Sequence, residues 1–295
     1  MNCKEIKNII VKFIHDKVEE TGLRNVVIGL SGGVDSSLVA TLAVEALGKD
    51  KVIGVIMPNS YIETGSVECC SDDSGINKCR ENLMDAKNLA ESLGIKYYVK
   101  PLTNIMNTEY LLEFGRSYND LVRLGNIKAR MRMILLYDMA MINDAIVLGT
   151  TNKTELLLGY FTKYGDGGVD IEPISDIYKT EVFRLARYIG VPDKIVDKSP
   201  SADLWDGQTD EGELGIKYSE LDQILWWLVE EEYDARELEK ELSKLTSITD
   251  KIMVEKVLDM MDINYHKTHM PKSCKVGNID VRTTIADNIR CDNDD

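Results

Sequence analysis

One short segment near the N-terminus constrains the fold of this chain more than any other. The apolar run Val26–Ile28 has the β-branched composition of a buried strand. A loop of small residues follows it, and the stretch Ser36–Val44 then has the composition of a helix. The loop has the sequence Gly29-Leu30-Ser31-Gly32-Gly33-Val34-Asp35-Ser36. A strand, a glycine turn and a helix N-terminus in this order make an anion site, because free backbone N–H groups and the positive end of the helix face the loop.

Short apolar segments alternate with helical ones over the first part of the chain. We expect strands at residues 25–30, 51–57, 95–99 and 145–148, and helices at 6–18, 36–47, 82–93 and 119–142. The first helix places Ile6, Ile9, Ile10, Phe13, Ile14 and Val18 on one face. Fully apolar short strands between helices predict an α/β fold, a Rossmann-like parallel sheet with helices on both faces. Ligands of such sheets bind at the carboxyl ends of the strands, where the glycine loop and Gly149-Thr150 stand.

The C-terminal third carries no strand signal. Helices are expected at 218–232, 234–244 and 249–263. No internal repeat is present. We therefore expect one domain over residues 1–295, with an α/β core at about 1–200 and a mainly helical part at about 201–295.

The glycine loop differs from the two common nucleotide-binding loops. It lacks the Gly-Lys-[Ser/Thr] of a Walker A motif and the spacing of the Gly-x-Gly-x-x-Gly turn. An ordinary tight turn is the alternative for a lone Gly-Gly pair, whereas the full Ser-Gly-Gly-x-Asp-Ser sequence after a strand favours phosphate binding. It resembles the pyrophosphate loop of the N-type ATP pyrophosphatases, whose fold is of the adenine nucleotide alpha hydrolase type. That superfamily binds the β- and γ-phosphates of ATP and activates a substrate by adenylation.

The composition of the 295-residue chain argues against general nucleic-acid binding. It has 35 basic and 50 acidic residues and a net charge of −15, whereas a nucleic-acid-binding surface is basic. An anionic substrate would need a local basic pocket. No apolar run reaches the roughly 18–20 residues of a membrane helix. The N-terminus lacks the apolar core of a signal peptide, so we expect a cytoplasmic protein.

Cysteine usage agrees with a reducing compartment. The chain has six cysteines without a Cys-x-x-Cys pair, so reduced thiols are expected. Three of them, Cys69, Cys70 and Cys79, belong to a long polar loop that runs from Pro58 to Arg80. A metal or redox role for this trio is the alternative, but no fourth ligand is evident.

A second cluster of polar residues follows the strand expected at 145–148, where periodicity predicts a loop. Charged and aromatic side chains alternate there with glycines, which is rare in surface loops. The cluster contains Glu155, Tyr160, Phe161, Lys163, Tyr164, Asp166 and Asp170. The sequence Gly-Tyr-Phe-Thr-Lys-Tyr-Gly-Asp-Gly-Gly at 159–168 resembles the signature of the NAD synthetase family. Further matches, in the family's order, lie at 125–130, 178–180, 200–204, 208–215 and 266–267, and the resemblance spans about residues 5–270.

The resemblance implies a ligase that completes NAD synthesis. Members of the family convert deamido-NAD, whose nicotinate carries a carboxylate, into the amide. Because a carboxylate is a poor acyl donor, it first attacks the α-phosphate of ATP and forms an NAD-adenylate with release of pyrophosphate. Ammonia then attacks the carbonyl carbon and AMP leaves.

The resemblance also assigns roles to residues. ATP is bound by Gly29, Leu30, Ser31, Gly32, Gly33, Val34, Asp35, Ser36, Thr150, Lys179 and Ser201. Mg²⁺, the expected cofactor, is bound by Asp35 and Glu155. Deamido-NAD is bound by Arg130, Lys163, Asp170, His266 and Lys267. The catalytic residues are Asp35, Lys179 and Lys163, which act by positioning and electrostatics without a covalent nucleophile. The lysines and Arg130 supply the local basic pocket.

Two further properties follow from the family. Some NAD synthetases take ammonia from glutamine through a fused nitrilase-like domain, for which the match near the N-terminus leaves no room. We therefore expect free ammonia as the nitrogen donor, unless a separate glutaminase docks. The family is usually homodimeric, with the dinucleotide site near the interface.

The chain departs from the family pattern in two places. The loop Asn59–Cys79 is longer than expected, which leaves any adenine or ribose contact after the second strand open. The sequence Thr268-His269-Met270-Pro271-Lys272 replaces a more basic continuation, and His269 either supplies a lost contact or is simply exposed.

Two alternatives to an NAD synthetase remain. Another enzyme of the superfamily, a tRNA thiolase or the synthetase part of GMP synthetase, would share the glycine loop, but neither carries the stretch Phe161–Asp170. A non-catalytic nucleotide sensor would keep the loop and lose Glu155 or Lys179, and both are present.

Overall fold

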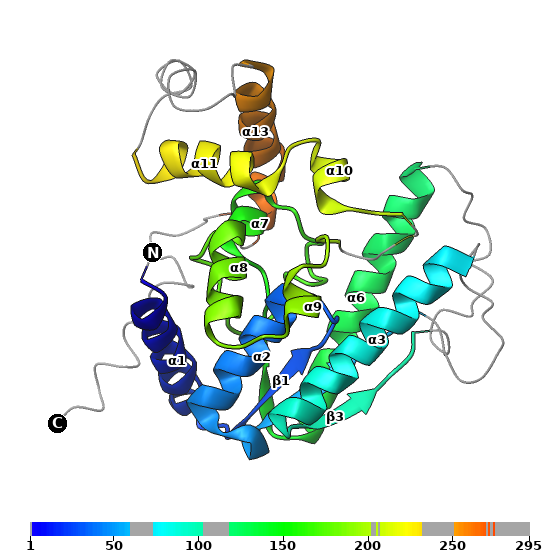
Figure 1. The fold of residues 1–295 in the computed structure, drawn as a ribbon, viewed down its shortest axis with the longest axis vertical. Coiled ribbons are helices and arrows are strands. Elements are labelled where there is room, and N and C mark those ends of the chain that lie inside the picture. Colours follow the sequence, from blue (N-terminus) through cyan, green and yellow to red (C-terminus); the bar gives the residue numbers. More distant parts are fainter. Residues whose placement is uncertain are drawn as a thin grey trace.

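A four-stranded parallel sheet forms the centre of the structure (Figure 1). The computed structural model describes residues 2–59, 73–102, 118–201, 205, 207–231, 251–269, 271 and 274. The strands lie in the order β3-β2-β1-β4. Their bounds are Asn25–Gly29 for β1, Val52–Ile56 for β2, Lys96–Val99 for β3 and Ala145–Leu148 for β4.

The strand order reverses beside β1. From β1 the chain moves outward through β2 to β3, and β4 then pairs with the other edge of β1. Val26, for example, pairs with Val52 on one side and with Ile146 on the other. Such a switch point opens a crevice at the carboxyl ends of the two strands, and here these are the ends that carry the glycine loop and Gly149.

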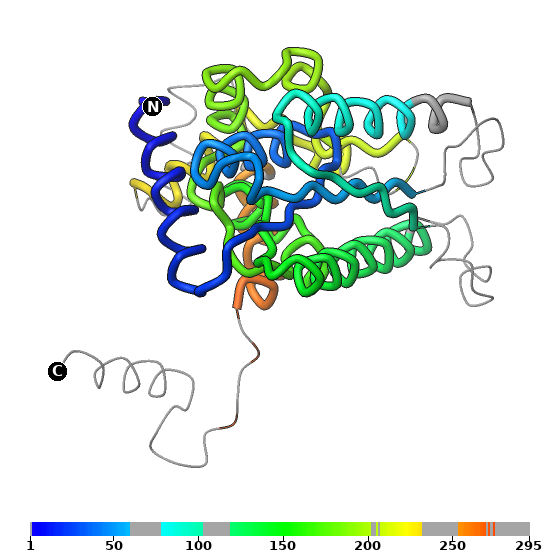
Figure 2. Tube along the Cα trace, turned by 90° about the horizontal axis from the view of Figure 1, so that it is seen from below, coloured from blue at the N-terminus to red at the C-terminus, as the bar shows by residue number. Residues whose placement is uncertain are grey.

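Helices cover both faces of the sheet, as Figure 2 shows edge-on. One face is packed by α1 (Cys3–Glu20), α2 (Val34–Leu47), α3 (Asp73–Leu93), α8 (Lys179–Tyr188) and α9 (Asp193–Val196). The other is covered by α6 (Tyr118–Ile142). Val26 and Ile28 join the first core and Val27 joins the second, because successive side chains of a strand point to opposite faces. Apolar side chains are needed on both sides, which explains the uninterrupted apolar strand sequences.

A separate apolar cluster joins helices beyond the carboxyl edge of the sheet (Figure 1). These helices are α7 (Lys153–Leu158), α11 (Tyr218–Val229) and α13 (Lys251–Asn264). Leu158, Leu221 and Val254 are buried where they meet. The short helix α10 (Asp210–Leu214) and the 3₁₀ turns η1 (Lys49–Lys51) and η2 (Tyr265–Lys267) complete the described elements. None of the helices in the described part of the chain combines the length and apolar character that a membrane crossing requires.

The expected α/β fold is confirmed, with differences at particular elements. Helix α3 begins at Asp73, whereas its sequence predicts a start near Asn82. In α1, Ile10, Ile14 and Val18 are buried, but Ile9 and Phe13 are 61% and 36% exposed. The periodicity of a helix shows which side is apolar, but not how much of that side is covered by the rest of the protein. In α1 only a narrow stripe of the apolar side is covered. The helix expected at 234–244 lies outside the described residues.

Candidate active site

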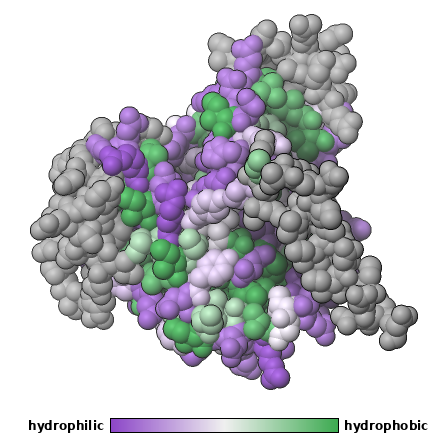
Figure 3. All heavy atoms as spheres, turned by 180° about the vertical axis from the view of Figure 1, so that it is seen from behind, coloured by the Kyte–Doolittle hydropathy of each residue, from purple (hydrophilic) through white to green (hydrophobic). Residues whose placement is uncertain are grey.

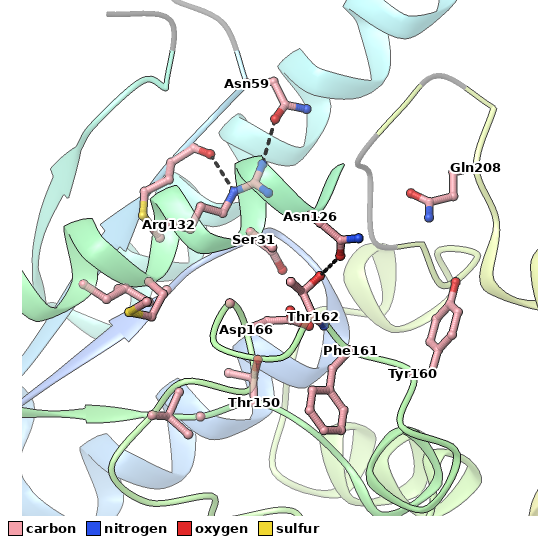
Figure 4. Close-up of a pocket in the computed structure, with 18 of the residues that line it drawn as sticks. Ser31, Asn59, Asn126, Arg132, Thr150, Tyr160, Phe161, Thr162, Asp166 and Gln208 are labelled. Carbon is pink, nitrogen blue, oxygen red and sulfur yellow. Dashed lines mark hydrogen bonds between the residues drawn. The ribbon is translucent and has the colours of Figure 1, made fainter. Parts of the chain in front are cut away.

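Two adjoining cavities occupy the carboxyl edge of the sheet. The larger has a volume of about 410 Å³ and the smaller about 210 Å³. Ser31, Asn82, Thr150, Tyr160 and Asp166 line both. Figure 4 shows the larger cavity, with Ser31 and Thr150 from the ends of β1 and β4 facing it. The two cavities therefore form one continuous site at the predicted position.

The glycine loop ends in a helix start that no side chain caps. Gly33 is the N-cap residue of α2, and no side chain caps the free N–H groups of the first turn. The hydroxyls of Ser36 and Ser37 donate to the Gly33 carbonyl at 3.1 and 2.7 Å, and both serines are buried. These two hydrogen bonds close the loop onto the first turn of α2. The uncapped helix start remains the expected anion-binding element.

Three charged side chains from three helices meet in the smaller cavity. Lys179 Nζ, in a side chain only 3% exposed, donates to Asp35 Oδ2 at 2.6 Å and to Glu155 Oε1 at 3.2 Å. Asn152 Nδ2 donates to the other oxygen of Asp35 at 3.0 Å. Asp35 lies in the first turn of α2, Glu155 lies in α7 and Lys179 begins α8. The expected ATP and metal residues are thus brought together from positions up to 144 residues apart.

Local sequence explains how Glu155 is oriented. Asn152 caps α7, and its Oδ1 accepts the Glu155 N–H at 3.0 Å. Glu155 Oε2 accepts the Asn152 N–H at 3.2 Å, which leaves Oε1 for Lys179. This capping box corrects the loop prediction for the stretch after β4, where α7 forms. The Asn-x-x-Glu spacing was the signal that could have located the helix.

Lys179 is held in place by the C-terminal helices. Its backbone N–H donates to Thr154 Oγ1 at 3.0 Å, and the Thr154 hydroxyl in turn donates to Asp222 of α11. The other oxygen of Asp222 accepts the Thr180 N–H at 2.7 Å. The Lys179 ammonium also lies 5.3 Å from the centre of the Tyr218 ring. Helix α11 therefore contributes directly to the position of a predicted catalytic residue.

The electrostatics of this cluster favour a cation. Burial raises the pKa of Glu155 to about 8, against the attraction of Lys179, and the nearby Asp35 carboxylate raises it further. Burial would lower the pKa of Lys179, but Asp35 and Glu155 outweigh it, so this pKa is raised. Asp35 and Glu155 thus share one ammonium, and the raised pKa of Glu155 favours its neutral form unless a further cation lies nearby.

The donor set fits Mg²⁺. This ion takes one or two protein carboxylates and completes its octahedron with substrate phosphates and water. Asp35 and Glu155 face one point beside the uncapped start of α2, where phosphates would lie. Among the described residues no group of three or more His, Cys, Asp and Glu side chains is arranged to hold a metal unaided. A metal here would depend on the phosphates of the nucleotide.

The larger cavity has a mostly apolar wall with a few polar groups. Arg132 of α6 crosses its upper part in Figure 4, where Nε donates to the Met57 carbonyl at 3.3 Å and Nη2 to Asn59 Oδ1 at 2.8 Å. Asp166 Oδ1 accepts the Thr162 N–H at 2.9 Å. Its enclosure by protein raises the pKa of the Asp166 carboxyl, although the side chain is open to the cavity. An apolar slot with few polar contacts suits a nucleoside.

Comparison with known proteins identifies the family. The model of the NAD synthase family matches residues 6–72 and 73–271. This chain is an enzyme of the NAD synthase family. It is 43% identical over 282 residues to an NH(3)-dependent NAD(+) synthetase of Pyrococcus furiosus, an alignment that covers 95% of this chain and 97% of that protein.

Solved structures agree with the family. The structure of an NMN synthetase from Francisella tularensis matches with a TM-score of 0.73 at 32% identity. The match covers 93% of this chain and 99% of the Francisella chain. An NH3-dependent NAD synthetase from Campylobacter jejuni, in complex with the nitrate ion, has a TM-score of 0.72 at 30% identity, with 93% and 100% covered. The resemblance inferred from the sequence is confirmed.

The ATP-binding residues expected from the NAD synthase family converge on the two cavities. Residues 29–31 of the loop line the larger cavity, and Ser31 and residues 33–36 line the smaller. Thr150 lines both, and Ser201 lines the smaller, where its hydroxyl donates to the Gln208 carbonyl at 2.7 Å. Gly32 lines neither cavity, because it lies on the side of the loop that packs against α3.

The expected deamido-NAD residues are more dispersed. Lys267 lines the larger cavity, and its Nζ donates to the carbonyls of Gly159 and Phe161 at 2.7 and 3.0 Å. Burial lowers the pKa of this lysine. The other four line neither cavity. They are Arg130, Lys163, Asp170 and His266.

Those four residues nevertheless form contacts on the α6 side. Arg130 Nε donates to the Lys163 carbonyl at 3.3 Å, and Lys163 Nζ donates to the His266 carbonyl. The Asp170 carboxylate accepts the Val147 N–H at 2.7 Å and the Tyr137 hydroxyl at 3.0 Å. The Asp170 carboxylate thus ties β4 to α6.

Four residues of the site had no assigned role in the sequence. Asn152 binds Asp35, and Tyr160 lines both cavities while its hydroxyl donates to Glu213 Oε2 at 2.6 Å. Asp210 is buried and accepts the Tyr218 hydroxyl at 3.0 Å. Lys198 lines the smaller cavity beneath the loop. Only Asn152 had a local signal, the capping box.

Of the three cysteines of the long polar loop, Cys79 lines the larger cavity, and Cys69 and Cys70 lie outside the described residues.

Proposed function

We propose that this protein converts deamido-NAD into NAD with ATP and free ammonia, through an NAD-adenylate, and releases AMP and pyrophosphate. One observation carries the proposal. In a member of the NAD synthase family, Asp35, Glu155 and Lys179 meet at the uncapped start of α2. Anion-binding N–H groups, two metal-binding carboxylates and a cation at one point are what the capture of pyrophosphate needs.

In the first step, the nicotinate carboxylate of deamido-NAD attacks the α-phosphorus of ATP. The bond from that phosphorus to the bridging oxygen breaks, and its electron pair leaves with pyrophosphate. The start of α2 binds the leaving phosphates through N–H groups, and Lys179 offsets the charge that develops on them. In the second step ammonia attacks the acyl carbon, the bond to the AMP oxygen breaks, and the ammonia nitrogen loses a proton.

Asp35 and Glu155 are the residues that would hold Mg²⁺ in this proposal. When bound, the ion supplies positive charge to the phosphate oxygens. With it present, Glu155 would stay ionised, although burial favours its neutral form. The larger, mostly apolar cavity beside this centre is proposed to take the nucleoside part of ATP.

We also propose a homodimer with the dinucleotide site at its interface. Arg130 lies in α6, and Asp170 contacts this helix through Tyr137. The same helix exposes apolar side chains, with Ile134 53%, Met141 82% and Ile142 65% exposed. Figure 3 shows this side of the molecule, with apolar side chains gathered between polar ones. A cytoplasmic location belongs to the same proposal, because the cysteine usage agrees with a reducing compartment.

The decisive experiment incubates the purified chain with Mg²⁺, ATP, ammonium and deamido-NAD. Equal amounts of NAD, AMP and pyrophosphate are expected, whereas ADP as the product would refute adenylation. Glutamine replacing ammonium at equal rate would sink the choice of nitrogen donor. Nicotinate mononucleotide serves as the competing substrate, since one structural relative is an NMN synthetase. A higher kcat/KM with the mononucleotide would overturn the choice of dinucleotide.

A further inference from the structure

Lys198 joins three segments behind the glycine loop. Its Nζ donates to the Gly32 carbonyl at 3.2 Å, to Asn82 Oδ1 at 2.7 Å and to Asp85 Oδ2 at 2.7 Å. An ammonium group has three N–H donors, and these three acceptors account for all of them. Although Lys198 lines the smaller cavity, its donors are therefore directed at protein atoms. Its geometry is that of a brace and not of a phosphate ligand.

Asp85 makes this brace rigid. Its side chain is 3% exposed, and its two oxygens accept from Lys194 and Lys198 at 2.8 and 2.7 Å. Burial would raise the pKa of Asp85, but the two ammonium groups outweigh it and hold this pKa below its ordinary value. The carboxylate is thus ionised and paired on both sides.

The peptide between Gly32 and Gly33 is one whose plane could otherwise rotate. Gly32 has a φ of +78°, and a Cβ there would lie 2.4 Å from the Asn82 carbonyl oxygen, so the loop is pressed against the α3 backbone. Glycine on both sides of the Gly32–Gly33 peptide gives little resistance to a rotation of its plane. In a trans peptide the C=O and the next N–H point in opposite directions. The Gly33 N–H donates to Ser31 Oγ at 3.1 Å, so a rotation would break this hydrogen bond and turn the Gly32 carbonyl oxygen toward the cavity side of the loop.

We propose that Lys198 is a positioning residue, which holds the Gly32 carbonyl behind the loop so that N–H groups and no carbonyl oxygen face the pyrophosphate. The inference depends on the proposed function, because it takes this loop as the site of the ATP phosphates. Asp85 orients Lys198 and does not itself face the cavity.

Lys194 provides a matched control. Its Nζ also pairs with Asp85, at 2.8 Å, and its side chain is 63% exposed. Its hydrogen bond and ion pair in the described structure go to Asp85 and not to the loop. Removal of either lysine takes one charge from Asp85, but only the removal of Lys198 releases Gly32.

The test measures the Kd of Mg·pyrophosphate and of adenosine by calorimetry, for the wild type, Lys198→Met and Lys194→Met. Loss of a hydrogen bond to a charged group weakens a binding equilibrium that depends on it by on the order of tenfold. We expect this loss for pyrophosphate in Lys198→Met alone, with adenosine binding unchanged. A general structural role would weaken both ligands. An unchanged pyrophosphate Kd in Lys198→Met, or an equal loss in Lys194→Met, would overturn the proposal.

Two further variants separate the brace from folding. Asp85→Leu with Lys198→Met removes both charges together, which avoids an unpaired buried carboxylate. We expect this pair to fold and still to bind pyrophosphate weakly, and wild-type affinity in it would contradict the role of Lys198. Lys198→Arg keeps the charge and is expected to recover part of the affinity. A wild type that binds pyrophosphate but forms no NAD would count against the proposed function and leave this inference standing.

Discussion

The smaller cavity and the outer side of α6 hold two sets of expected ligand residues, and they are built differently. In the cavity, Asp35, Glu155 and Lys179 contact one another directly and are enclosed by α2, α7 and α8. On the α6 side, Arg130 and Lys163 make their described hydrogen bonds to backbone carbonyls, and Arg130 is exposed. One region is enclosed within one chain, and the other presents the expected deamido-NAD residues on an open surface.

The two regions differ in the source of their rigidity. Buried charges must be paired and oriented by their neighbours, so the cavity holds its geometry before a ligand arrives. Exposed cations keep their hydration and need a second surface to exclude water from their ligand. We therefore expect substitutions in the cavity to affect folding and turnover, and substitutions on the α6 side to affect substrate affinity alone.

The largest effect is expected for Lys179→Met. This change removes a buried ammonium and leaves the part-buried Asp35 and Glu155 side chains without their cation, which costs roughly 3–5 kcal/mol of unfolding free energy, and NAD formation is lost. Added Mg²⁺ should raise the melting temperature of this variant more than that of the wild type, because no ammonium then competes for Asp35 and Glu155.

Lys153→Met is the matched control, since Lys153 also pairs with two carboxylates, but these are more exposed, Asp176 at 94% and Glu230 at 38%. Thermal unfolding should show a loss of about 1 kcal/mol or less. Equal stabilisation of Lys179→Met and wild type by Mg²⁺ would mean that the two carboxylates do not bind the metal.

Asp35→Asn tests the electrostatic role with little change of shape. The amide can still accept from Asn152, so the fold is expected to persist. Loss of the charge should lower kcat for NAD formation by about 10²–10³. The exposed carboxylate of Asp176 gives the control Asp176→Asn, with wild-type turnover expected. A kcat for Asp35→Asn within threefold of the wild type would exclude this aspartate from the reaction centre.

Lys163→Ala tests the open surface. Its ammonium lies on the α6 side, 5.4 Å from the Tyr164 ring centre. We expect the KM for deamido-NAD to rise about tenfold, the worth of one charged contact, while the KM for ATP stays constant. Arg123→Ala, on the same helix as Arg130 and 59% exposed, should change neither constant. An increase in the KM for ATP instead would indicate that Lys163 binds ATP and not deamido-NAD.

The smallest effect concerns pH. Burial, and then the Asp166 charge, raise the pKa of Glu172 to about 6 from 4.5. The folded protein therefore holds this proton more tightly than the unfolded chain, and the stabilisation present below pH 4.5 disappears as the pH rises through 6. Glu172→Gln should remove on the order of 1 kcal/mol of this pH dependence, measured by denaturation from pH 4 to 7. The exposed substitution Glu19→Gln should leave the wild-type slope intact.

Much of the fold followed from local pattern, and the failures have physical causes. Four apolar strands and the helices between them were predictable because a parallel sheet buries both faces of each strand. Helix α7 was missed because six residues are too few for a period to appear, although its Asn-x-x-Glu cap was visible. The exposure of Ile9 and Phe13 was missed because contact width depends on what packs against a helix.

The candidate site divides in the same way. Contiguous residues were enough to predict the parallel α/β class, the glycine loop with Asp35 and the family signature that includes Lys163. The contacts between distant residues could be found only in the folded chain, where Lys179 lies between Asp35 and Glu155, Asn152 holds Asp35, and Lys198 contacts Gly32. The physical reason is that a buried charge must find its partner in space, and the partners here are 24 to 166 residues away along the chain.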